Sequence, residues 1–112
     1  DQKPAKIFFI GSTATGRKIM KAAAEHLIPV NLELGGKDAM IVLADADLDF
    51  ATSCAIWGGY SNTGQFCAAT ERVLVHESVA PKFMAMLKEK LQTLRQGPST
   101  GFDNDLGPIT FP

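Results

Sequence analysis

The chain opens with a short apolar run followed by a longer amphipathic stretch. Residues 7–10 read Ile-Phe-Phe-Ile and end at Gly11, a pattern that predicts a strand closed by a tight turn. The residues that follow place apolar side chains at helical spacing: Ile19, Met20, Ala23, Ala24 and Leu27. Pro29 ends this predicted helix, and residues 30–34 then alternate in polarity like a strand before Gly35-Gly36. The first 36 residues therefore predict a strand, a helix and a second strand.

A similar succession follows from residue 39. Residues 39–43 form an apolar run that predicts a third strand. Asp45 and Asp47 precede a stretch whose apolar positions share one helical face, Leu48, Ala51, Ala55 and Ile56. Acidic side chains favour the positive N-terminal end of a helix, so we expect the helix to begin here. We expect Gly58-Gly59 to loosen or end it.

The last third repeats the strand and helix pattern and then becomes irregular. Residues 64–67 predict a turn or loop, and the β-branched run at 73–75 predicts a strand. Ser78 is a candidate N-cap for a helix whose one face is formed by Phe83, Met86, Leu87, Lys90, Leu91 and Leu94. The basic side chains of Lys88, Lys90 and Arg95 suit the negative C-terminal end of this helix. Residues 97–112 show no periodicity and predict an irregular tail. This order of elements predicts an α/β fold with mostly parallel strands.

Composition and charge exclude several classes of protein. The 112 residues are 46% hydrophobic and 21% charged, which is typical of an ordinary globular domain. A net charge of −1 lacks the basic excess that nucleic-acid binding needs, and the apolar runs are far shorter than the ~18 residues of a membrane span. The first residues contain no apolar signal segment, and Cys54 and Cys67 lack metal-site spacing. We therefore expect a cytoplasmic protein with no nucleic-acid, membrane or metal partner.

The glycine turn at 11–16 lies between a predicted strand and a predicted helix, where free backbone N–H groups favour an anion such as phosphate. Ser12 could add a hydroxyl donor. A P-loop would need lysine at position 17, where the chain has Arg17, so a nucleoside-triphosphate site is not expected. The alternative is that this turn is merely the entry to a helix.

Two further residues are candidates for chemistry. Glu33 lies on an apolar strand before a Gly-Gly turn, so its carboxylate is either partly shielded and able to act as a general base, or an outward-facing strand residue. Cys67 follows Gly-Gln in a predicted loop and precedes two alanines, so it is either an approachable nucleophile or a small buried hydrophobe. Cys54 is expected to be buried, although the two thiols could also pair. His26 and His76 are expected to be surface or structural residues.

Two segments together resemble the active-site signatures of the aldehyde dehydrogenase superfamily. They are Leu-Glu-Leu-Gly-Gly-Lys at 32–37 and Asn-Thr-Gly-Gln-Phe-Cys at 62–67, and Glu33 and Cys67 are 34 positions apart, as in that family. Phe-Ile-Gly-Ser at 9–12 resembles the family's cofactor-contacting Phe-Thr-Gly-Ser turn. Residues 45–49 and 74–78 also fall where family members carry similar sequence, so the resemblance covers residues 6–109.

The resemblance implies a reaction. In that family's mechanism the Cys67 thiolate would attack an aldehyde carbonyl, the resulting thiohemiacetal would pass hydride to NAD or NADP, and Glu33 would activate water to hydrolyse the thioester. The Cys67 backbone N–H would be one oxyanion donor.

The resemblance also implies an organisation. Gly11 and Ser12 would approach the cofactor pyrophosphate, while Leu34 and Gly35 would lie near the nicotinamide. Residues 1–34 would close a Rossmann-type nucleotide-binding domain, residues 35–112 would begin the α/β catalytic domain, and the protein would be a homo-oligomer.

The sequence also departs from the family pattern. Ile10 replaces the frequent threonine, and most of both domains would lie outside these 112 residues. The family's second oxyanion donor, an asparagine, would lie upstream; Asn62 belongs to the cysteine signature and does not take that role. We therefore expect the isolated chain to be inactive. Two alternatives remain: a non-catalytic protein that associates through unpaired strands and apolar helix faces, and, ranked lower, a cofactor-independent thiol esterase.

Overall fold

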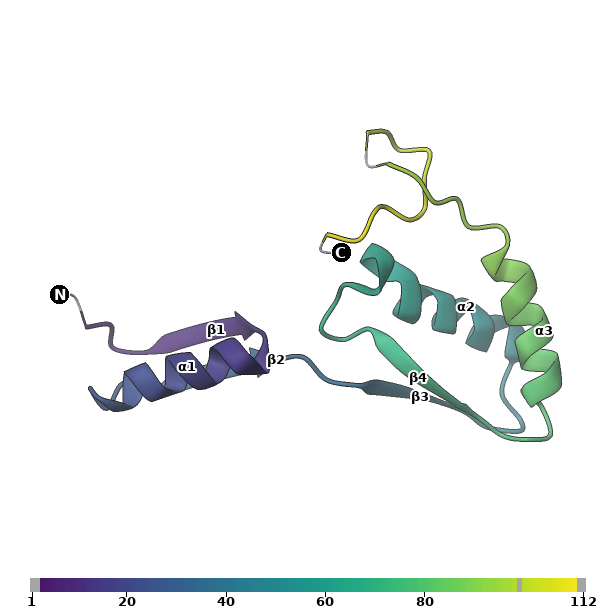
Figure 1. Ribbon diagram of the computed structural model, residues 1–112. Coiled ribbons are helices and arrows are strands. Elements are labelled where there is room, and N and C mark those ends of the chain that lie inside the picture. Colours follow the sequence, from purple (N-terminus) through teal and green to yellow (C-terminus); the bar gives the residue numbers. More distant parts are fainter. Residues whose placement is uncertain (1–2, 99, 111–112) are drawn as a thin grey trace. The chain divides into compact units, whose positions relative to one another are not determined.

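A computed structural model describes residues 3–98 and 100–110 (Figure 1). The chain divides into two compact units, Asp1–Gly36 and Lys37–Pro112, hereafter the N-terminal and C-terminal units. In each unit two strands pair in parallel, and helices follow the strands along the chain. The α/β class predicted from the sequence is thus confirmed. The assignment of residues 1–34 and 35–112 to cofactor binding and catalysis stays a prediction.

The N-terminal unit is a single strand, helix, strand motif. Strand β1 (Ile7–Gly11) pairs in parallel with β2 (Val30–Leu34), and helix α1 (Thr13–Ala24) connects them. The helix covers one face of this pair, and its buried Gly16 makes the close approach possible. A Cβ at position 16 would lie 3.0 Å from Leu34 Cδ2. Glycine therefore sets how closely α1 packs on β2.

Both ends of α1 are closed by local hydrogen bonds. Ser12 is the N-cap, and its Oγ accepts a hydrogen bond from Thr15 N–H at 3.2 Å. At the other end, Ile28 N–H donates to Ala23 O at 3.1 Å while Leu27 adopts a left-handed conformation with φ of 53°. This is the Schellman closure, in which glycine is the usual left-handed residue. Leu27 is a costly occupant of that position because its Cβ crowds the backbone.

The C-terminal unit contains the larger core. Strand β3 (Asp38–Val42) pairs in parallel with β4 (Thr70–Val75), and helices α2 (Leu48–Tyr60) and α3 (Ala80–Leu91) pack with them (Figure 1). The buried residues of this core are Val42, Ala51, Ala55 and Phe83. A short 3-10 turn, η1 (Ser61–Gly64), leaves the end of α2 and leads towards β4.

The structure differs from the sequence interpretation in two details. Helix α2 runs through Gly58-Gly59 and ends directly after them, at Tyr60. Position 58 requires glycine because a Cβ there would lie 2.5 Å from Thr70 Oγ1 at the start of β4. Ser78 does not cap α3, whose N-cap residue is Val79 and has no side-chain hydrogen bond. The Ser78 hydroxyl instead lies 2.9 Å from His76 Nδ1.

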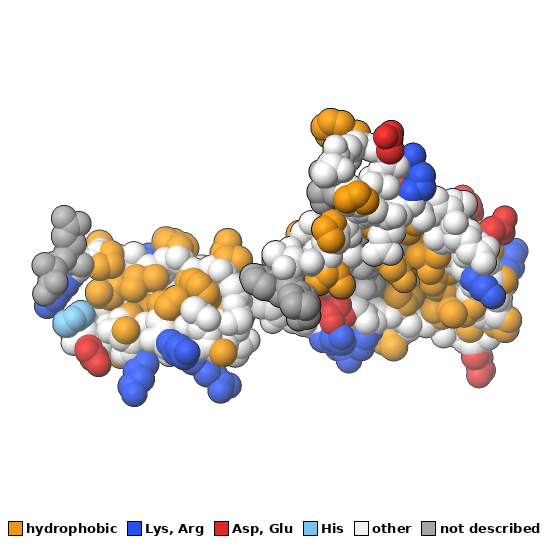
Figure 2. Space-filling model, turned by 45° about the horizontal axis from the view of Figure 1, so that its top comes forward, with side chains coloured by type: hydrophobic (Ala, Val, Ile, Leu, Met, Phe, Trp, Pro, Cys, Tyr) orange, Lys and Arg blue, Asp and Glu red, His pale blue; other side chains and the backbone are white. Residues whose placement is uncertain are grey.

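Each strand pair has an apolar face that no described residue of its own unit covers. Phe8 and Ile10 on β1 are 71% and 74% exposed, and Ile41 on β3 is 68% exposed. Figure 2 shows hydrophobic side chains gathered on the visible surface of each unit. Parallel sheets are normally covered on both faces, so these strand pairs have the exposed surface of a sheet that packs against more protein.

The segment after α3 is irregular, as predicted, but it is held to the unit by specific bonds. Gln96 and Leu106 form an isolated parallel bridge. Arg95 Nε lies 3.1 Å from Asp105 Oδ2, and Arg95 N–H donates to the same carboxylate oxygen at 2.9 Å. The guanidinium and backbone hydrogen bonds of Arg95 lower the pKa of Asp105 below its ordinary value.

Candidate active site

Cys67 lies on the exposed segment between η1 and β4. We call η1 and this segment together, residues 61–69, the cysteine loop. The side chains of Phe66, Cys67 and Ala68 are exposed, and Ala69 is buried and anchors the loop at the start of β4. Cys67 is a free thiol, and its backbone N–H donates no hydrogen bond within the described residues. The loop therefore presents both a thiol and an unused backbone donor to solvent.

The residues before Cys67 have an unusual backbone. Asn62, Thr63 and Gly64 are three consecutive residues with left-handed φ values of 51°, 59° and 74°. Glycine adopts this conformation freely, and asparagine tolerates it, but a β-branched threonine there is a genuine outlier. The main chain is therefore strained in the turn at residues 62–64, which precedes the candidate nucleophile Cys67.

Cys54 lies in a different environment. It is on α2, half-buried, and borders a surface hollow lined by Met40, Trp57, Gly58, Ala68 and Thr70 among others. Both cysteines are free thiols in the structure, so the pairing considered above is not formed. Of the two thiols, Cys67 is the more accessible.

Of the two alternatives for Glu33, the structure shows the outward-facing strand residue within the N-terminal unit. Glu33 is exposed on β2, whereas its neighbours Leu32 and Leu34 face Gly16 of α1. Alternation along the strand directs Glu33 to the opposite face, which is the uncovered one. Glu33 belongs to the N-terminal unit and Cys67 to the C-terminal unit, so each is placed only within its own unit.

The candidate cofactor residues come together in the N-terminal unit. Gly11 pairs in register with Leu34, so the carboxyl ends of β1 and β2 lie side by side. Ser12 follows directly and begins α1, and Gly35 follows β2. Ligands of open parallel sheets bind at this edge, outside the carboxyl ends of the strands. The four residues thus occupy one edge of the strand pair.

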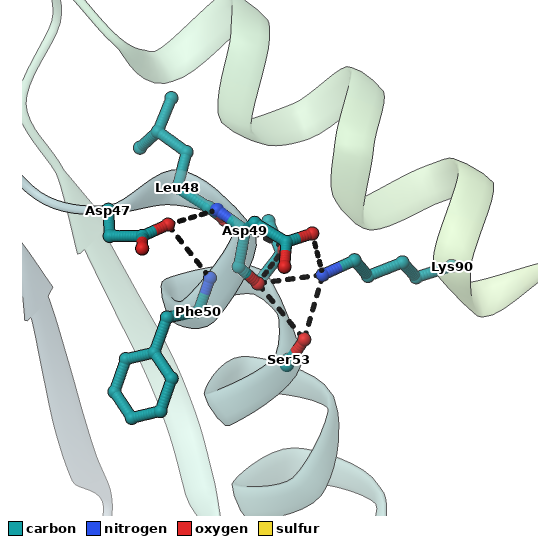
Figure 3. A network of polar contacts seen from close by, with 7 residues as sticks. Asp47, Leu48, Asp49, Phe50, Ser53 and Lys90 are labelled. Carbon is teal, nitrogen blue, oxygen red and sulfur yellow. Dashed lines mark hydrogen bonds and ion pairs between the residues drawn. The ribbon is translucent and has the colours of Figure 1, made fainter.

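A polar network joins α2 to α3 in the C-terminal unit (Figure 3). Lys90 Nζ lies 2.8 Å from Asp49 Oδ1 and donates to Asp49 O and Ser53 Oγ, each at 2.7 Å. Asp47 caps the same end of α2 by accepting hydrogen bonds from the backbone N–H groups of Asp49 and Phe50. The sequence interpretation placed Lys90 in the last turn of a helix but did not foresee this cross-link. The network fixes the first turn of α2 against α3.

The remaining titratable candidates have structural positions. His26 and His76 are exposed, and His76 contacts Ser78 as described. Within residues 3–98 and 100–110, no group of three His, Cys, Asp or Glu side chains is arranged to hold a metal ion. No helix in the described part of the chain is long and apolar enough to cross a bilayer.

Site and fold together define a class: an α/β protein of parallel strands with an exposed cysteine on a strained loop. Residues 1–111 match the model of the aldehyde dehydrogenase family. The chain belongs to this family.

Two relatives illustrate the sequence similarity of this chain to aldehyde-oxidising enzymes. The chain is 48% identical over 97 residues to 4,4'-diapolycopene aldehyde oxidase of Methylomonas sp., covering 87% of this chain and 18% of that protein. It is 47% identical over 105 residues to a mitochondrial aldehyde dehydrogenase of Leishmania tarentolae, covering 93% and 21%.

A solved structure agrees in fold. Betaine aldehyde dehydrogenase of Staphylococcus aureus, crystallised with NAD+, superposes with a TM-score of 0.88 at 37% identity, covering 94% of this chain and 21% of that one. The chain thus spans about a fifth of the length of the relatives it matches.

Proposed function

We propose that the protein containing these residues oxidises an aldehyde to a carboxylic acid, with Cys67 as the nucleophile. The observation that carries the proposal is the exposed Cys67 thiol on a strained loop, inside the family's cysteine signature. Strained backbone persists where surrounding contacts hold it, and it clusters at active sites. The identities of the relatives support the aldehyde as the substrate class.

The proposed chemistry uses Cys67 of the cysteine loop and Glu33 of β2. The Cys67 thiolate adds to the aldehyde carbonyl carbon, which forms a C–S bond and places a negative charge on the carbonyl oxygen. The unused N–H of Cys67 is available to donate a hydrogen bond to that oxyanion. Oxidation of the thiohemiacetal leaves a thioester on Cys67. Glu33 then takes a proton from water, which attacks the thioester, releases the acid and restores the thiol.

A nicotinamide cofactor, NAD or NADP, would supply the hydride acceptor for this oxidation. The residues of the N-terminal unit fit its phosphate end: Gly11 and Ser12 are exposed, and the N–H groups of Thr13 and Ala14 donate no hydrogen bond within the described residues. A Cβ at position 11 would lie 2.6 Å from the Phe9 ring, so glycine keeps this turn open. Leu34 and Gly35 would border the nicotinamide end.

Cysteine replacement in the complete protein encoded by the reading frame tests this function. We expect Cys67→Ser to abolish aldehyde-dependent reduction of the cofactor and Cys54→Ser, the matched control, to leave it nearly unchanged. Glu33→Gln should permit a burst of reduced cofactor followed by a slow steady state, because the amide cannot accept a proton from water. Full activity in Cys67→Ser would refute the proposal.

The isolated chain of 112 residues is expected to show no such oxidation. Loss of one oxyanion donor alone typically costs about 10²- to 10³-fold in rate, and a further share of the cofactor contacts is expected elsewhere. Homo-oligomeric assembly and cytoplasmic location also remain proposals; curated relatives include mitochondrial and peroxisomal proteins.

A second candidate function for the chain by itself is non-catalytic association. The uncovered apolar faces of β1 and β3 favour it, since such surfaces are typical of interaction sites. Cofactor-dependent turnover that requires Cys67 in the isolated chain would exclude this reading.

A further inference from the structure

The strained cysteine loop is hydrogen-bonded to residues 107–110, which lie far from it in the sequence. Thr63 Oγ1 donates to Gly107 O at 3.0 Å. Gln65 Nε2 donates to Pro108 O at 3.4 Å, and Gln65 Oε1 accepts from Thr110 N–H at 2.7 Å. Both side chains are half-buried, and both belong to the C-terminal unit together with residues 107–110. The loop and this segment, more than 40 positions apart, are therefore joined by three side-chain hydrogen bonds.

Gln65 also closes the loop on itself. Its Nε2 donates to Asn62 O at 3.2 Å, while Asn62 Nδ2 donates to Gln65 O at 2.9 Å. The backbone N–H of Gln65 bonds to Asn62 O at 3.1 Å. These bonds span the three left-handed residues, so the same glutamine that reaches the outer segment also fixes the strained turn. Cys67 follows Gln65 by two positions.

We propose that Thr63 and Gln65 are positioning residues that fasten the cysteine loop to residues 107–110 and thereby fix the place of Cys67. The left-handed conformation is unfavourable for threonine, so the bond from Thr63 to Gly107 O and the bonds between Asn62 and Gln65 together hold it. Without these bonds the turn relaxes, and the thiol moves away from the position that attack on a carbonyl requires. This role rests on the proposed function of Cys67 as the nucleophile.

Substitutions in the complete protein test the proposal. Gln65→Leu removes the donor and acceptor at similar size, and Thr63→Val removes the hydroxyl while keeping the branched Cβ. Thr63→Ser retains the hydroxyl and is the conservative rescue. Gln92→Leu is the matched control, because Gln92 is an exposed residue at the end of α3 whose side chain makes no hydrogen bond within the described residues.

Two measurements are made on each variant. Hydrogen–deuterium exchange should rise about fivefold or more in peptides covering residues 61–69 and 106–110 for both Gln65→Leu and Thr63→Val. Thr63→Val loses one hydrogen bond, worth about 1 kcal/mol, and Gln65→Leu loses three. The burst rate of cofactor reduction, which reports acylation of Cys67, should fall about tenfold to hundredfold with a smaller change in KM. Thr63→Ser and Gln92→Leu should stay near the parent in both.

The outcomes separate the two proposals. Faster hydrogen–deuterium exchange with an unchanged burst rate would show that the bonds are merely structural, and it would overturn the positioning role. Unchanged exchange in residues 61–69 and 106–110 would overturn it as well. Full activity in Cys67→Ser would instead refute the proposed function, whatever the exchange shows. Thr63→Val alters a single hydroxyl, so it provides the decisive result if Gln65→Leu fails to fold.

Discussion

Gly58 offers a substitution whose effect on stability depends on one neighbour. It lies inside α2, where alanine is normally favoured over glycine by about 1 kcal/mol. A Cβ at position 58 would, however, lie 2.5 Å from Thr70 Oγ1 and 3.3 Å from Thr70 Cβ. Ordinary contacts between carbon atoms are about 3.5–4.0 Å, so either α2 or the start of β4 must shift.

The two effects oppose each other, and their sizes decide the sign. Overpacking of this kind costs about 1–3 kcal/mol, against a gain of about 1 kcal/mol in helix propensity. Because two atoms of a β-branched side chain are involved, we expect Gly58→Ala to lower the free energy of unfolding by about 1–2 kcal/mol. In a Thr70→Ala background the 2.5 Å contact with Oγ1 is gone and only the slightly short 3.3 Å contact with Cβ is left, so the same substitution should be neutral or stabilising by up to about 1 kcal/mol.

Urea unfolding followed by far-UV circular dichroism measures all four members of this double-mutant cycle. Protein concentration is held constant, because association between copies would make apparent stability depend on it. The expected coupling energy is about 2 kcal/mol. If Gly58→Ala has the same sign and size in both backgrounds, the contact with Thr70 is not the reason that glycine is needed in α2.

Three further results are expected of the 112-residue chain. Limited iodoacetamide labelling with peptide mass mapping should modify Cys67 well before Cys54, and equal or reversed labelling would contradict the exposure of the loop. Because the pKa of Asp105 is lowered in the folded chain, its bonds to Arg95 stabilise the fold fully above the unfolded pKa of about 3.9. This stabilisation is lost as pH falls below that value and through the lowered pKa of the folded chain. Amide exchange of Asp105 and Leu106, compared at equal intrinsic rate, should therefore lose protection in acid, whereas Asp105→Asn should show no such step. Gel filtration with light scattering over a dilution series should reveal dimers or larger species, because apolar strand faces are uncovered; a monodisperse monomer would argue against this.

Periodicity predicted the elements well where one side of each element is buried. Residues 30–34 alternate in polarity and form β2, with Leu32 and Leu34 facing α1. Asp47 was expected near the start of a helix and is the N-cap of α2. In these segments the pattern and the packing require the same residues, so sequence alone suffices.

The errors arise where a tertiary contact outweighs a local preference. Glycine is unfavourable in helices, yet α2 has glycine at position 58 because Thr70 occupies the space where a Cβ would lie. The serine at 78 is a good cap in principle, but its hydroxyl pairs with His76. The polar start of β4 at Thr70 also lacked an apolar signal.

Part of the candidate site could be predicted from the sequence, and part could not. The resemblance singled out Cys67 and Glu33, and parallel pairing brings Gly11 and Leu34 into one register position. The bonds from Thr63 and Gln65 to residues 107–110 join segments more than 40 positions apart, which local spacing cannot indicate. Their only signal is that both residues belong to the cysteine signature.

The left-handed Leu27 at the end of α1 is a position where substitution should make the protein more stable. Its side chain is 90% exposed, so it contributes little packing in exchange for its backbone cost of about 1–2 kcal/mol. Leu27→Gly should raise the thermal midpoint, since the relief exceeds the added flexibility of the unfolded chain. The same change removes an exposed apolar side chain. It is therefore the first substitution to introduce when the N-terminal unit is engineered for expression and spectroscopy.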